Sequence, residues 1–312
     1  MRVLVCDPIH EDGVRMMREA GFQVDLKTAI TGDELIEAVG DYDALVVRSR
    51  TKVTGEVLAR GRRLKAVARA GVGLDNIDVE EARRRGVEVV NSPEAPSNAV
   101  AELVLGFMLS LARRIPEADA GMKRGEWMKG RLRGFELSGK TLGIIGFGRI
   151  GYLLGKKAKA LGMRVLAYDV IIDKRMEYVE DAGAEAVSME TLLASSDFVT
   201  VHVPLLPQTR HMIGRREIEM MKRGAYLINA ARGAIVDEDA LREALLSGRL
   251  AGAALDVYEE EPPRDTRLTG MRNVVCTPHI GAETAEAQRA NSTIVAEKLI
   301  KILAPAEGQR SS

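Results

Sequence analysis

The sequence predicts an α/β protein built from two doubly wound parallel sheets. Short apolar runs alternate with helical segments through the first ninety residues, and a second series of the same kind begins at residue 141. The motif G-x-G-x-x-G, at residues 146–151, opens this second series. Short apolar strands separated by helices are typical of parallel sheets that carry helices on both faces, so these observations indicate two such sheets in one chain.

Length and composition fit a two-domain globular protein. The 312 residues include 45 basic and 45 acidic side chains, so the formal net charge is zero and no basic field attracts nucleic acid or an anionic membrane. Cys6 and Cys276 lack C-x-x-C spacing, which predicts reduced structural thiols and no metal site. No leader-like or membrane-spanning apolar run occurs, so we expect a cytoplasmic protein.

The first series consists of short apolar strands separated by helices. The predicted strands span residues 2–6, 23–26, 44–47, 65–68 and 87–90. A helix at 11–20 is closed by Gly21, and another at 33–39 is capped by Thr31 or Asp33. Side-chain oxygens of this kind accept hydrogen bonds from the free N–H groups at the start of a helix.

A long helix is predicted at 98–114, after a loop that contains two prolines. Its apolar residues lie around most of the helix circumference, which indicates a helix buried between domains or between subunits. We therefore expect a homodimer or a homotetramer. The segment 121–139 is basic, contains several glycines and holds the only tryptophan, Trp127.

The second series has the same alternating organisation. Its predicted strands span residues 142–145, 164–168, 198–202, 225–229, 253–257 and 274–277. The last predicted element is an amphipathic helix at 284–303. The polar tail at 305–312 is expected to be disordered.

The glycine motif lies between a predicted strand and a predicted helix, which is the order that a dinucleotide site requires. Gly146 permits a tight turn, Gly148 lets the backbone approach a pyrophosphate, and Gly151 lets helix and strand pack closely. The start of the helix adds free N–H groups and a partial positive charge. The alternative interpretation is a glycine-rich structural turn.

An acidic residue, Asp169, ends the strand that follows the glycine motif. A carboxylate there accepts hydrogen bonds from the adenosine ribose and repels a 2′-phosphate, so NAD is favoured over NADP. Lys174 and Arg175 follow closely and weaken that preference. An ordinary surface aspartate is the alternative, and FAD is less favoured because no second flavin-contacting glycine motif follows.

Four histidines occur in the sequence, and two of them, His10 and His211, lie in polar, turn-like contexts where a solvated role is expected. His202 ends a predicted strand and precedes Val203 and Pro204. Open α/β sheets bind ligands at the carboxyl ends of their strands, so we expect these three residues on the cofactor side.

Three further side chains, Arg232, Glu261 and His279, follow the ends of successive predicted strands. The planar fork of Arg232 suits a substrate carboxylate. Glu261 would hold the His279 imidazole in one tautomer and favour its charged form. Each residue alone is more often structural or solvated, but together they suit hydride transfer in which His279 exchanges a proton with the substrate oxygen.

Several stretches together resemble the D-isomer-specific 2-hydroxyacid dehydrogenase family. They are GFGRIG at 146–151, VHVPL at 201–205, ARG at 231–233, VDE at 236–238, ALDV at 254–257, EPP at 261–263 and PHIG at 278–281. The resemblance covers essentially the whole chain. It implies a flavodoxin-like substrate-binding domain at 1–95 with 285–312, and a Rossmann NAD-binding domain at 96–284.

The resemblance also implies roles for individual residues. The catalytic arginine, glutamate and histidine of the family fall on Arg232, Glu261 and His279. The cofactor contacts of the family fall on Arg149, Ile150, Asp169, Val203, Ala230, Asp256 and Gly281.

The resemblance is greatest to family members that oxidise 3-phospho-D-glycerate to 3-phosphooxypyruvate, the first step of L-serine biosynthesis. It rests on the stretches 47–54, 69–78 and 277–284. Arg48, Arg50, Lys52 and Arg69 place positive charge at strand ends of the first domain, as a phosphorylated substrate requires. The residues expected to bind substrate are Arg48, Ser49, Arg69, Val72, Gly73, Arg232 and His279.

Other functions stay open at this point. A glyoxylate or hydroxypyruvate reductase, or another D-2-hydroxyacid dehydrogenase, would carry the same motifs. An NAD-sensing corepressor-like protein shares the fold, although the lack of extra terminal interaction segments argues against it. Val72 stands where some relatives carry a hydroxyl, and we expect the short form of the enzyme, without a regulatory domain or serine feedback.

Overall fold

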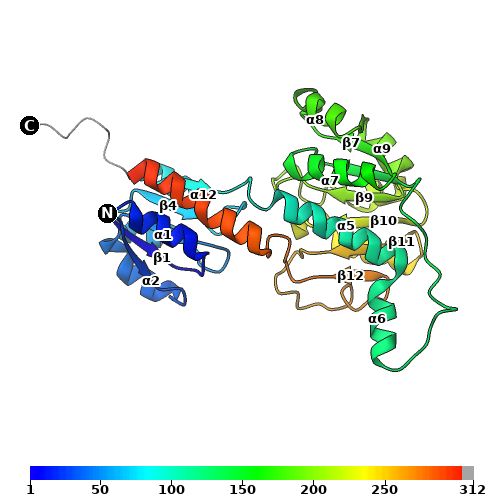
Figure 1. Ribbon diagram of the computed structural model, residues 1–312, viewed down its shortest axis with the longest axis horizontal. Coiled ribbons are helices and arrows are strands. Elements are labelled where there is room, and N and C mark those ends of the chain that lie inside the picture. Colours follow the sequence, from blue (N-terminus) through cyan, green and yellow to red (C-terminus); the bar gives the residue numbers. More distant parts are fainter. Residues whose placement is uncertain (304–312) are drawn as a thin grey trace, which may run out of the picture. The chain divides into compact units, whose positions relative to one another are not determined.

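The structure is a computed structural model that describes residues 1–303. The chain divides into two compact units, which we call unit 1 and unit 2 (Figure 1). Unit 1 comprises Met1–Pro96 together with the chain from Ala282 onward, and unit 2 comprises Ser97–Gly281. The tail at 305–312, for which the sequence predicts disorder, lies outside the described residues.

Within its described residues, unit 1 contains a five-stranded parallel sheet in the order β2-β1-β3-β4-β5. This is the strand order of flavodoxin-like folds. The strands are β1 (Arg2–Val5), β2 (Gln23–Leu26), β3 (Ala44–Val47), β4 (Ala66–Arg69) and β5 (Glu88–Asn91). The helices are α1 (Glu11–Glu19), α2 (Gly32–Ala38), η1 (Val39–Asp41), α3 (Gly55–Arg60), α4 (Val79–Arg84) and α12 (Ala285–Leu303).

Helix α12 belongs to unit 1 although it is the last helix along the chain (Figure 1). Its residues Val295 and Leu299 share a buried cluster with Met17 of α1. A Cβ atom at Gly13 would lie 2.6 Å from the Ser292 carbonyl oxygen. Glycine at this position therefore allows α1 and α12 to approach closely.

Unit 2 contains a seven-stranded parallel sheet in the order β12-β11-β10-β9-β6-β7-β8, counted over the same described part of the chain. The first strand, β6, lies between β7 and β9, which is the reversal of strand order typical of dinucleotide-binding sheets. The strands are β6 (Thr141–Ile145), β7 (Arg164–Tyr168), β8 (Glu185–Ala186), β9 (Phe198–Val201), β10 (Ala225–Asn229), β11 (Leu250–Leu255) and β12 (Val274–Cys276). The helices are α5 (Ser97–Arg113), α6 (Ile115–Lys123), α7 (Arg149–Ala160), η2 (Ile172–Arg175), α8 (Met176–Asp181), α9 (Met189–Ser195), α10 (Arg215–Met220), η3 (Gly233–Ile235) and α11 (Glu238–Leu246).

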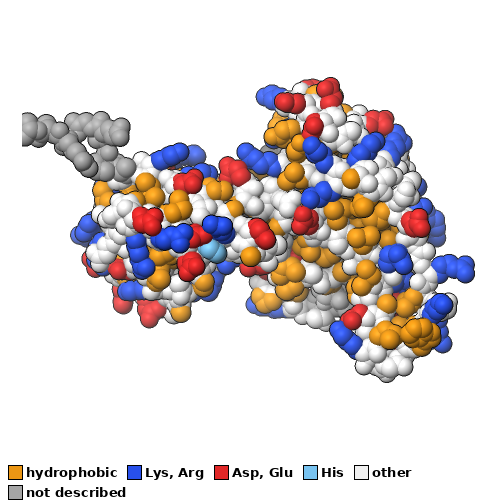
Figure 2. Space-filling model, in the orientation of Figure 1, with side chains coloured by type: hydrophobic (Ala, Val, Ile, Leu, Met, Phe, Trp, Pro, Cys, Tyr) orange, Lys and Arg blue, Asp and Glu red, His pale blue; other side chains and the backbone are white. Residues whose placement is uncertain are grey.

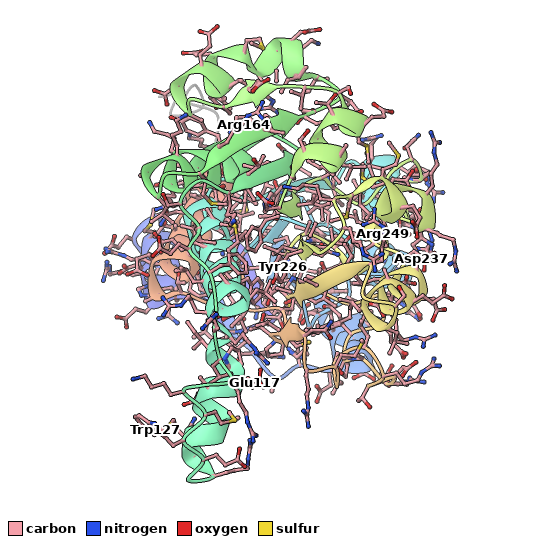
Figure 3. The ribbon with its side chains drawn as sticks, turned by 90° about the vertical axis from the view of Figure 1, so that its right-hand side faces the viewer. Glu117, Trp127, Arg164, Tyr226, Asp237 and Arg249 are labelled. Carbon is pink, nitrogen blue, oxygen red and sulfur yellow. The ribbon has the colours of Figure 1, made fainter. Side chains whose placement is uncertain are left out.

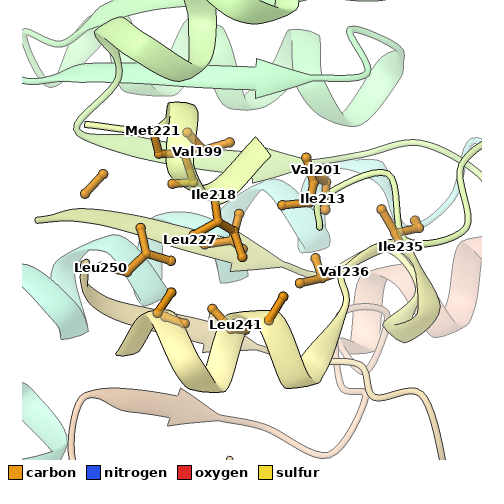
Figure 4. Packing of buried hydrophobic residues seen from close by; sticks show 14 of the residues in the cluster. Val199, Val201, Ile213, Ile218, Met221, Leu227, Ile235, Val236, Leu241 and Leu250 are labelled. Atoms are coloured by element: carbon orange, nitrogen blue, oxygen red, sulfur yellow. The ribbon is translucent and has the colours of Figure 1, made fainter. Parts of the chain in front are cut away.

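The sheet of unit 2 contributes to two buried apolar clusters. In one, Leu227 of β10 packs with Ile218 of α10 and Leu241 of α11 (Figure 4). In the other, Ile144 of β6 packs with Leu154 of α7. Burying each such side chain contributes roughly 1.5–3 kcal/mol relative to leaving it in water. The predicted fold class, two doubly wound parallel sheets, is confirmed.

Three local features differ from the sequence-based predictions. Helix α6 was not predicted; it follows Arg114, whose φ of 53° turns the chain before the helix starts. Strand β8 has only two residues, both exposed, and gives no apolar signal. On helix α5, whose apolar residues predict burial between domains or between subunits, Leu109 is 42% exposed within this single chain.

The described residues contain neither a membrane-spanning helix nor a metal-binding cluster. Within residues 1–303, no helix is both long and apolar enough to cross a bilayer. The same residues include no group of three or more His, Cys, Asp or Glu side chains suited to a metal ion. Cys6 is buried and Cys276 half-buried, and both are free thiols.

Candidate active site

The glycine motif forms the turn from β6 into α7, and its glycines meet tight steric limits. Gly146 has a φ of 92°, and a Cβ atom on it would lie 2.5 Å from the His202 carbonyl oxygen. A Cβ atom on Gly151 would lie 2.5 Å from the Gly146 carbonyl oxygen. At Gly148, by contrast, a Cβ atom would meet no described atom within 4 Å. The first and third glycines thus allow the chain to pack, and the second leaves open space at the turn.

That open space lies at the N-terminus of α7, a helix of 12 residues. Gly148 is its N-cap and has no side chain to satisfy the first N–H groups of the helix. Free N–H groups and the helix dipole together attract anionic groups such as a pyrophosphate. The predicted contacts Arg149 and Ile150 occupy the first two positions of this helix. The turn therefore fits the pyrophosphate of a dinucleotide.

Asp169 follows β7, and its carboxylate is fixed beside the glycine turn. Its Oδ2 atom accepts a hydrogen bond from the Phe147 N–H at 3.0 Å, and Oδ1 accepts one from the Ile171 N–H at 3.0 Å. Each carboxylate oxygen has a second lone pair, so both remain able to accept ribose hydroxyls. The next residue, Val170, is 87% exposed and supplies apolar surface of the kind that a nucleobase covers.

His202 lies directly after β9, the strand next to β6. Its Nε2 atom lies 3.1 Å from Thr200 Oγ1. Its Nδ1 atom is buried and has no hydrogen-bond partner within residues 1–303. Burial lowers the pKa of the imidazole to about 4, so the ring is neutral at physiological pH. A buried polar atom without a partner suits a ligand contact. Val203 and Pro204 come next in the chain, also just past the carboxyl end of β9, where open α/β sheets bind ligands.

His279 and Glu261 form a direct pair in unit 2. The Nδ1 atom of His279 lies 2.7 Å from Glu261 Oε2. The glutamate therefore fixes the tautomer in which Nδ1 carries a proton, and Nε2 is the atom left to exchange a proton with a substrate. The His279 side chain is 45% exposed, so a ligand can reach it. The pair also lines a cavity of about 400 Å³; the lining residues are Tyr258, Glu261, Pro262, Pro263, Thr269, Cys276, Thr277, Pro278 and His279.

The carboxyl of Glu261 is held in its ionised form. Burial is the largest single influence on its pKa and acts to raise it, whereas the hydrogen bond and the charge of His279 act to lower it. The Tyr258 N–H and the charge of Arg232 act in the same direction, and the net pKa of Glu261 is lowered. A carboxylate that stays charged stabilises an imidazolium at His279.

Asp256 organises the loop that carries His279. Its carboxylate is 1% exposed and accepts hydrogen bonds from Thr277 Oγ1 at 2.6 Å, from the Ile280 N–H at 2.8 Å and from the Gly281 N–H at 2.8 Å. Its carbonyl oxygen accepts the His279 N–H at 2.8 Å. These four hydrogen bonds hold the backbone of His279 at a φ of 55°, a conformation that few residues other than glycine adopt. The cofactor contact expected for Asp256 and Gly281 remains a prediction.

Arg232 follows β10, and the turn that carries it is held against the Glu261 segment. A Cβ atom at Gly233 would lie 1.9 Å from the Tyr258 carbonyl carbon, so only glycine permits this approach. The buried Asn229 side chain donates a hydrogen bond to the Arg232 carbonyl oxygen at 2.9 Å and accepts one from the Ala231 N–H at 3.1 Å. Arg232, Glu261 and His279 thus belong to one connected structure within unit 2.

Sequence reasoning missed the residues that hold this structure in place. Asn229 fixes the Arg232 turn, and the Tyr258 hydroxyl donates to the carbonyl oxygens of Leu255 at 3.3 Å and Thr277 at 3.0 Å. The only available signal was a polar or aromatic residue at the end of an apolar strand, which by itself does not distinguish a support from a ligand contact.

The residues expected to bind substrate in unit 1 lie after β3 and β4. Arg48 and Ser49 follow β3, and Arg69 ends β4. Val72 is 38% exposed, and its carbonyl oxygen accepts a hydrogen bond from the Asn91 amide at 2.6 Å. Gly73 is the next residue in the same loop.

Arg50 is already engaged by the chain. Its guanidinium donates to the carbonyl oxygens of Ile30 at 2.9 Å, Cys6 at 2.5 Å and Thr28 at 3.0 Å, and it lies 3.0 Å from Asp7 Oδ1. These acceptors use most of the donors that a guanidinium offers. The contacts indicate that Arg50 holds loops of unit 1 together.

Comparison with known proteins points to one family. The sequence pattern of the D-isomer specific 2-hydroxyacid dehydrogenase NAD binding domain matches residues 105–281. The chain is 52% identical over 304 residues to a D-3-phosphoglycerate dehydrogenase of Methanocaldococcus jannaschii, covering 97% of this chain and 57% of that protein. It thus spans little more than half the length of that relative.

Two further proteins match this chain along almost their whole length. A hydroxypyruvate reductase of Thermotoga maritima is 45% identical, with 97% of this chain and 98% of that protein covered. A crystal structure of a Thermus thermophilus protein superposes with a TM-score of 0.88 at 36% identity, covering 97% of each chain. The chain therefore shares its fold with this solved protein along almost the whole length of both.

Proposed function

Because the chain belongs to the D-isomer-specific 2-hydroxyacid dehydrogenase family, and NAD is the cofactor of that family's nucleotide domain, we propose that it oxidises 3-phospho-D-glycerate to 3-phosphooxypyruvate. The family resemblance predicted from the sequence is confirmed, and so is NAD as the cofactor. The dehydrogenase activity belongs to the proposal, because the chain spans little more than half the length of the D-3-phosphoglycerate dehydrogenase that it matches. The phosphorylated substrate, and with it the first step of L-serine biosynthesis in the cytoplasm, is the proposal.

The observation that carries the chemistry is the pair formed by His279 Nδ1 and Glu261 Oε2 at 2.7 Å. In the proposed reaction, Nε2 of His279 removes the proton from the 2-hydroxyl group as the carbonyl forms. Glu261 stabilises the resulting imidazolium, and Arg232 binds the substrate carboxylate through its planar fork. When bound, NAD supplies the acceptor for the hydride that leaves C2. In the reverse direction His279 returns the proton to the carbonyl oxygen.

The phosphorylated substrate is supported by the 52% identity to a D-3-phosphoglycerate dehydrogenase and by the cations Arg48 and Arg69 in unit 1. The similarity to a hydroxypyruvate reductase makes that activity the second candidate. Comparing kcat/KM for hydroxypyruvate with and without its phosphate separates the two. We expect the phosphorylated form to be favoured by more than tenfold, which corresponds to about 1.4 kcal/mol. A smaller ratio would favour the reductase.

The preference for NAD is proposed to depend on Asp169, whose carboxylate lies beside the glycine turn. Asp169→Ala removes the charge that repels a 2′-phosphate, so the ratio of kcat/KM with NAD to that with NADP should fall. Lys174→Ala, a few residues on, serves as the control for a general change in local charge. An unchanged ratio in Asp169→Ala would show that other residues set the preference.

We also propose that the enzyme is a homodimer or homotetramer, and that a second copy covers an apolar surface of unit 2. Its side chains come from α5, from the region of α6 and from the loop after α6. Figure 2 shows hydrophobic side chains gathered where α6 lies, and Figure 3 labels Trp127 beside that helix. Its members are Leu109 (42% exposed), Ile115 (49%), Met122 (55%) and Trp127 (78%). Side chains of this size are rarely left so exposed together on a monomer. A monomeric mass by light scattering at micromolar concentration would contradict the proposal.

A further inference from the structure

An ion pair in unit 1 engages an arginine that the proposed function assigns to the substrate. The Nη2 atom of Arg48 donates to Oε1 of Glu283. The Arg48 side chain is 23% exposed and the Glu283 side chain 48% exposed. The pair thus lies at the surface, where a ligand from solvent can reach both partners.

Arg48 projects from a backbone that is held on both sides. Its N–H donates to Asp7 Oδ2 at 2.5 Å, and its carbonyl oxygen accepts a hydrogen bond from the Asn76 amide at 2.7 Å. Asp7 is 1% exposed and also accepts from Thr51 Oγ1 at 2.8 Å. The backbone of the loop after β3 is therefore held by hydrogen bonds on both sides of Arg48, and the torsions of the side chain set where the guanidinium lies.

Glu283 lies beside a backbone held by hydrogen bonds, and its side chain is 48% exposed. The next residue, Thr284, accepts the Ala287 N–H at 3.2 Å, and the Gln288 amide donates to the Ala282 carbonyl oxygen at 2.8 Å. These bonds fix the chain where it enters α12. The exposed carboxylate can rotate into solvent when another anion takes its place.

We propose that Glu283 is a specificity-determining residue that competes with the substrate phosphate for Arg48. The inference rests on the proposed function, in which Arg48 binds the phosphorylated substrate. A carboxylate and a phosphate both accept charge-assisted hydrogen bonds from a guanidinium. Two anions at one guanidinium repel each other, and the Nη2 donor that Glu283 uses is then not available to the phosphate. Binding of the phosphate then includes the loss of the Glu283 contact, and the pair lowers the affinity for phosphorylated substrates.

The test is Glu283→Gln, with KM and kcat measured for 3-phospho-D-glycerate and for D-glycerate. Exposed ion pairs are weak, so we expect KM for the phosphorylated substrate to fall about two- to fivefold. KM for D-glycerate and kcat for both substrates should stay unchanged, because Glu283 takes no part in the chemistry. An unchanged or higher KM for 3-phospho-D-glycerate would overturn the proposal, and so would an equal fall for both substrates.

Two control variants make the result specific. Glu286→Gln removes the same charge from an exposed site in the first turn of α12, and it should leave KM unchanged. In an Arg48→Gln background, Glu283→Gln should have no further effect on KM. If Glu286→Gln lowered KM as much as Glu283→Gln, the change would come from the loss of one negative charge anywhere nearby. The same conclusion would follow if Glu283→Gln lowered KM equally in the Arg48→Gln background.

Failure of the proposed function can be told apart from failure of this inference. The substrate preference is measured on the wild-type enzyme alone, as the ratio of kcat/KM for hydroxypyruvate with its phosphate to that without it. The role of Glu283 is read from the ratio of variant to wild-type KM for 3-phospho-D-glycerate, whichever substrate is preferred.

Discussion

Two of the described histidines in unit 2 pair with a glutamate, and the two pairs look alike. His279 Nδ1 lies 2.7 Å from Glu261 Oε2, and His211 Nε2 lies 2.9 Å from Glu259 Oε1. Both histidines have a left-handed backbone, with φ of 55° at His279 and 50° at His211. Local geometry alone would therefore assign the same role to both.

Their surroundings differ. The His279 pair lines a cavity and is joined to Arg232, whose charge helps to lower the pKa of Glu261. The His211 pair connects to a second carboxylate, because the Glu259 N–H donates to Glu238 Oε1 at 2.8 Å. Burial first, and then the charge of Glu259, raises the pKa of Glu238. The His279 pair thus has a cavity and a nearby cation, as the proposed acid–base role requires, whereas the His211 pair joins two loops.

The largest expected effect separates the two histidines directly. His279→Ala removes the group that exchanges the substrate proton, and kcat should fall by about 10²–10⁴-fold. His211→Ala breaks a pair of similar geometry that the substrate does not use, and kcat should change by less than about threefold, an effect below about 1 kcal/mol. Steady-state rates of both variants give the comparison. Similar losses in the two variants would mean that both pairs act through structure.

Replacing the two glutamates, Glu261 and Glu259, should change kcat by different factors, with a smaller difference than between the two histidine variants. Glu261→Gln removes the charge that stabilises the imidazolium, and hydrogen bonds to charged groups contribute about 1.5–3 kcal/mol. We therefore expect kcat to fall by roughly 10–100-fold, with KM nearly unchanged. The matched variant is Glu259→Gln, for which kcat should remain near the wild-type value. If Glu261→Gln kept full activity, the charge of the carboxylate would be irrelevant to proton transfer.

A third histidine, His202, has no carboxylate partner within residues 1–303, and the pH dependence of stability distinguishes it from the two paired histidines. Burial lowers its pKa from 6.5 to about 4, so between these pH values the unfolded chain binds more protons than the folded one. The free energy of unfolding must then decrease as pH falls from 6.5 towards 4, by at most roughly 3 kcal/mol from this group. Urea unfolding of wild type and His202→Asn across this range measures the difference. Parallel pH curves for the two proteins would contradict the neutral, buried state of His202.

The positions of candidate site residues could be predicted from the sequence where they follow a recognisable apolar strand. Gly146, Asp169 and His279 each follow a strand whose apolar run is readable, and parallel strands bring their carboxyl ends to one edge of a sheet. The fold class predicted from this alternation is confirmed, whereas the order of strands within each sheet was not predicted.

What the sequence could not show is how a side chain is used once the chain has folded. Arg48 and Arg50 look equivalent in sequence, yet Arg50 is engaged by three carbonyl oxygens and Arg48 by Glu283, 235 residues away. Asp256 likewise accepts a hydrogen bond from the Gly281 N–H, 25 residues further along the chain. Such pairings depend on long-range packing, which leaves no periodic pattern in the sequence.

The central claim is that the imidazole of His279 carries the substrate proton. Chemical rescue tests it most directly: His279→Ala leaves a space in which free imidazole can act as the base. Turnover of 3-phospho-D-glycerate with NAD should be low without imidazole and should rise in a saturable way when imidazole is added at a pH where it is neutral. Near-wild-type turnover without imidazole, or a low rate that imidazole does not raise, would contradict the claim.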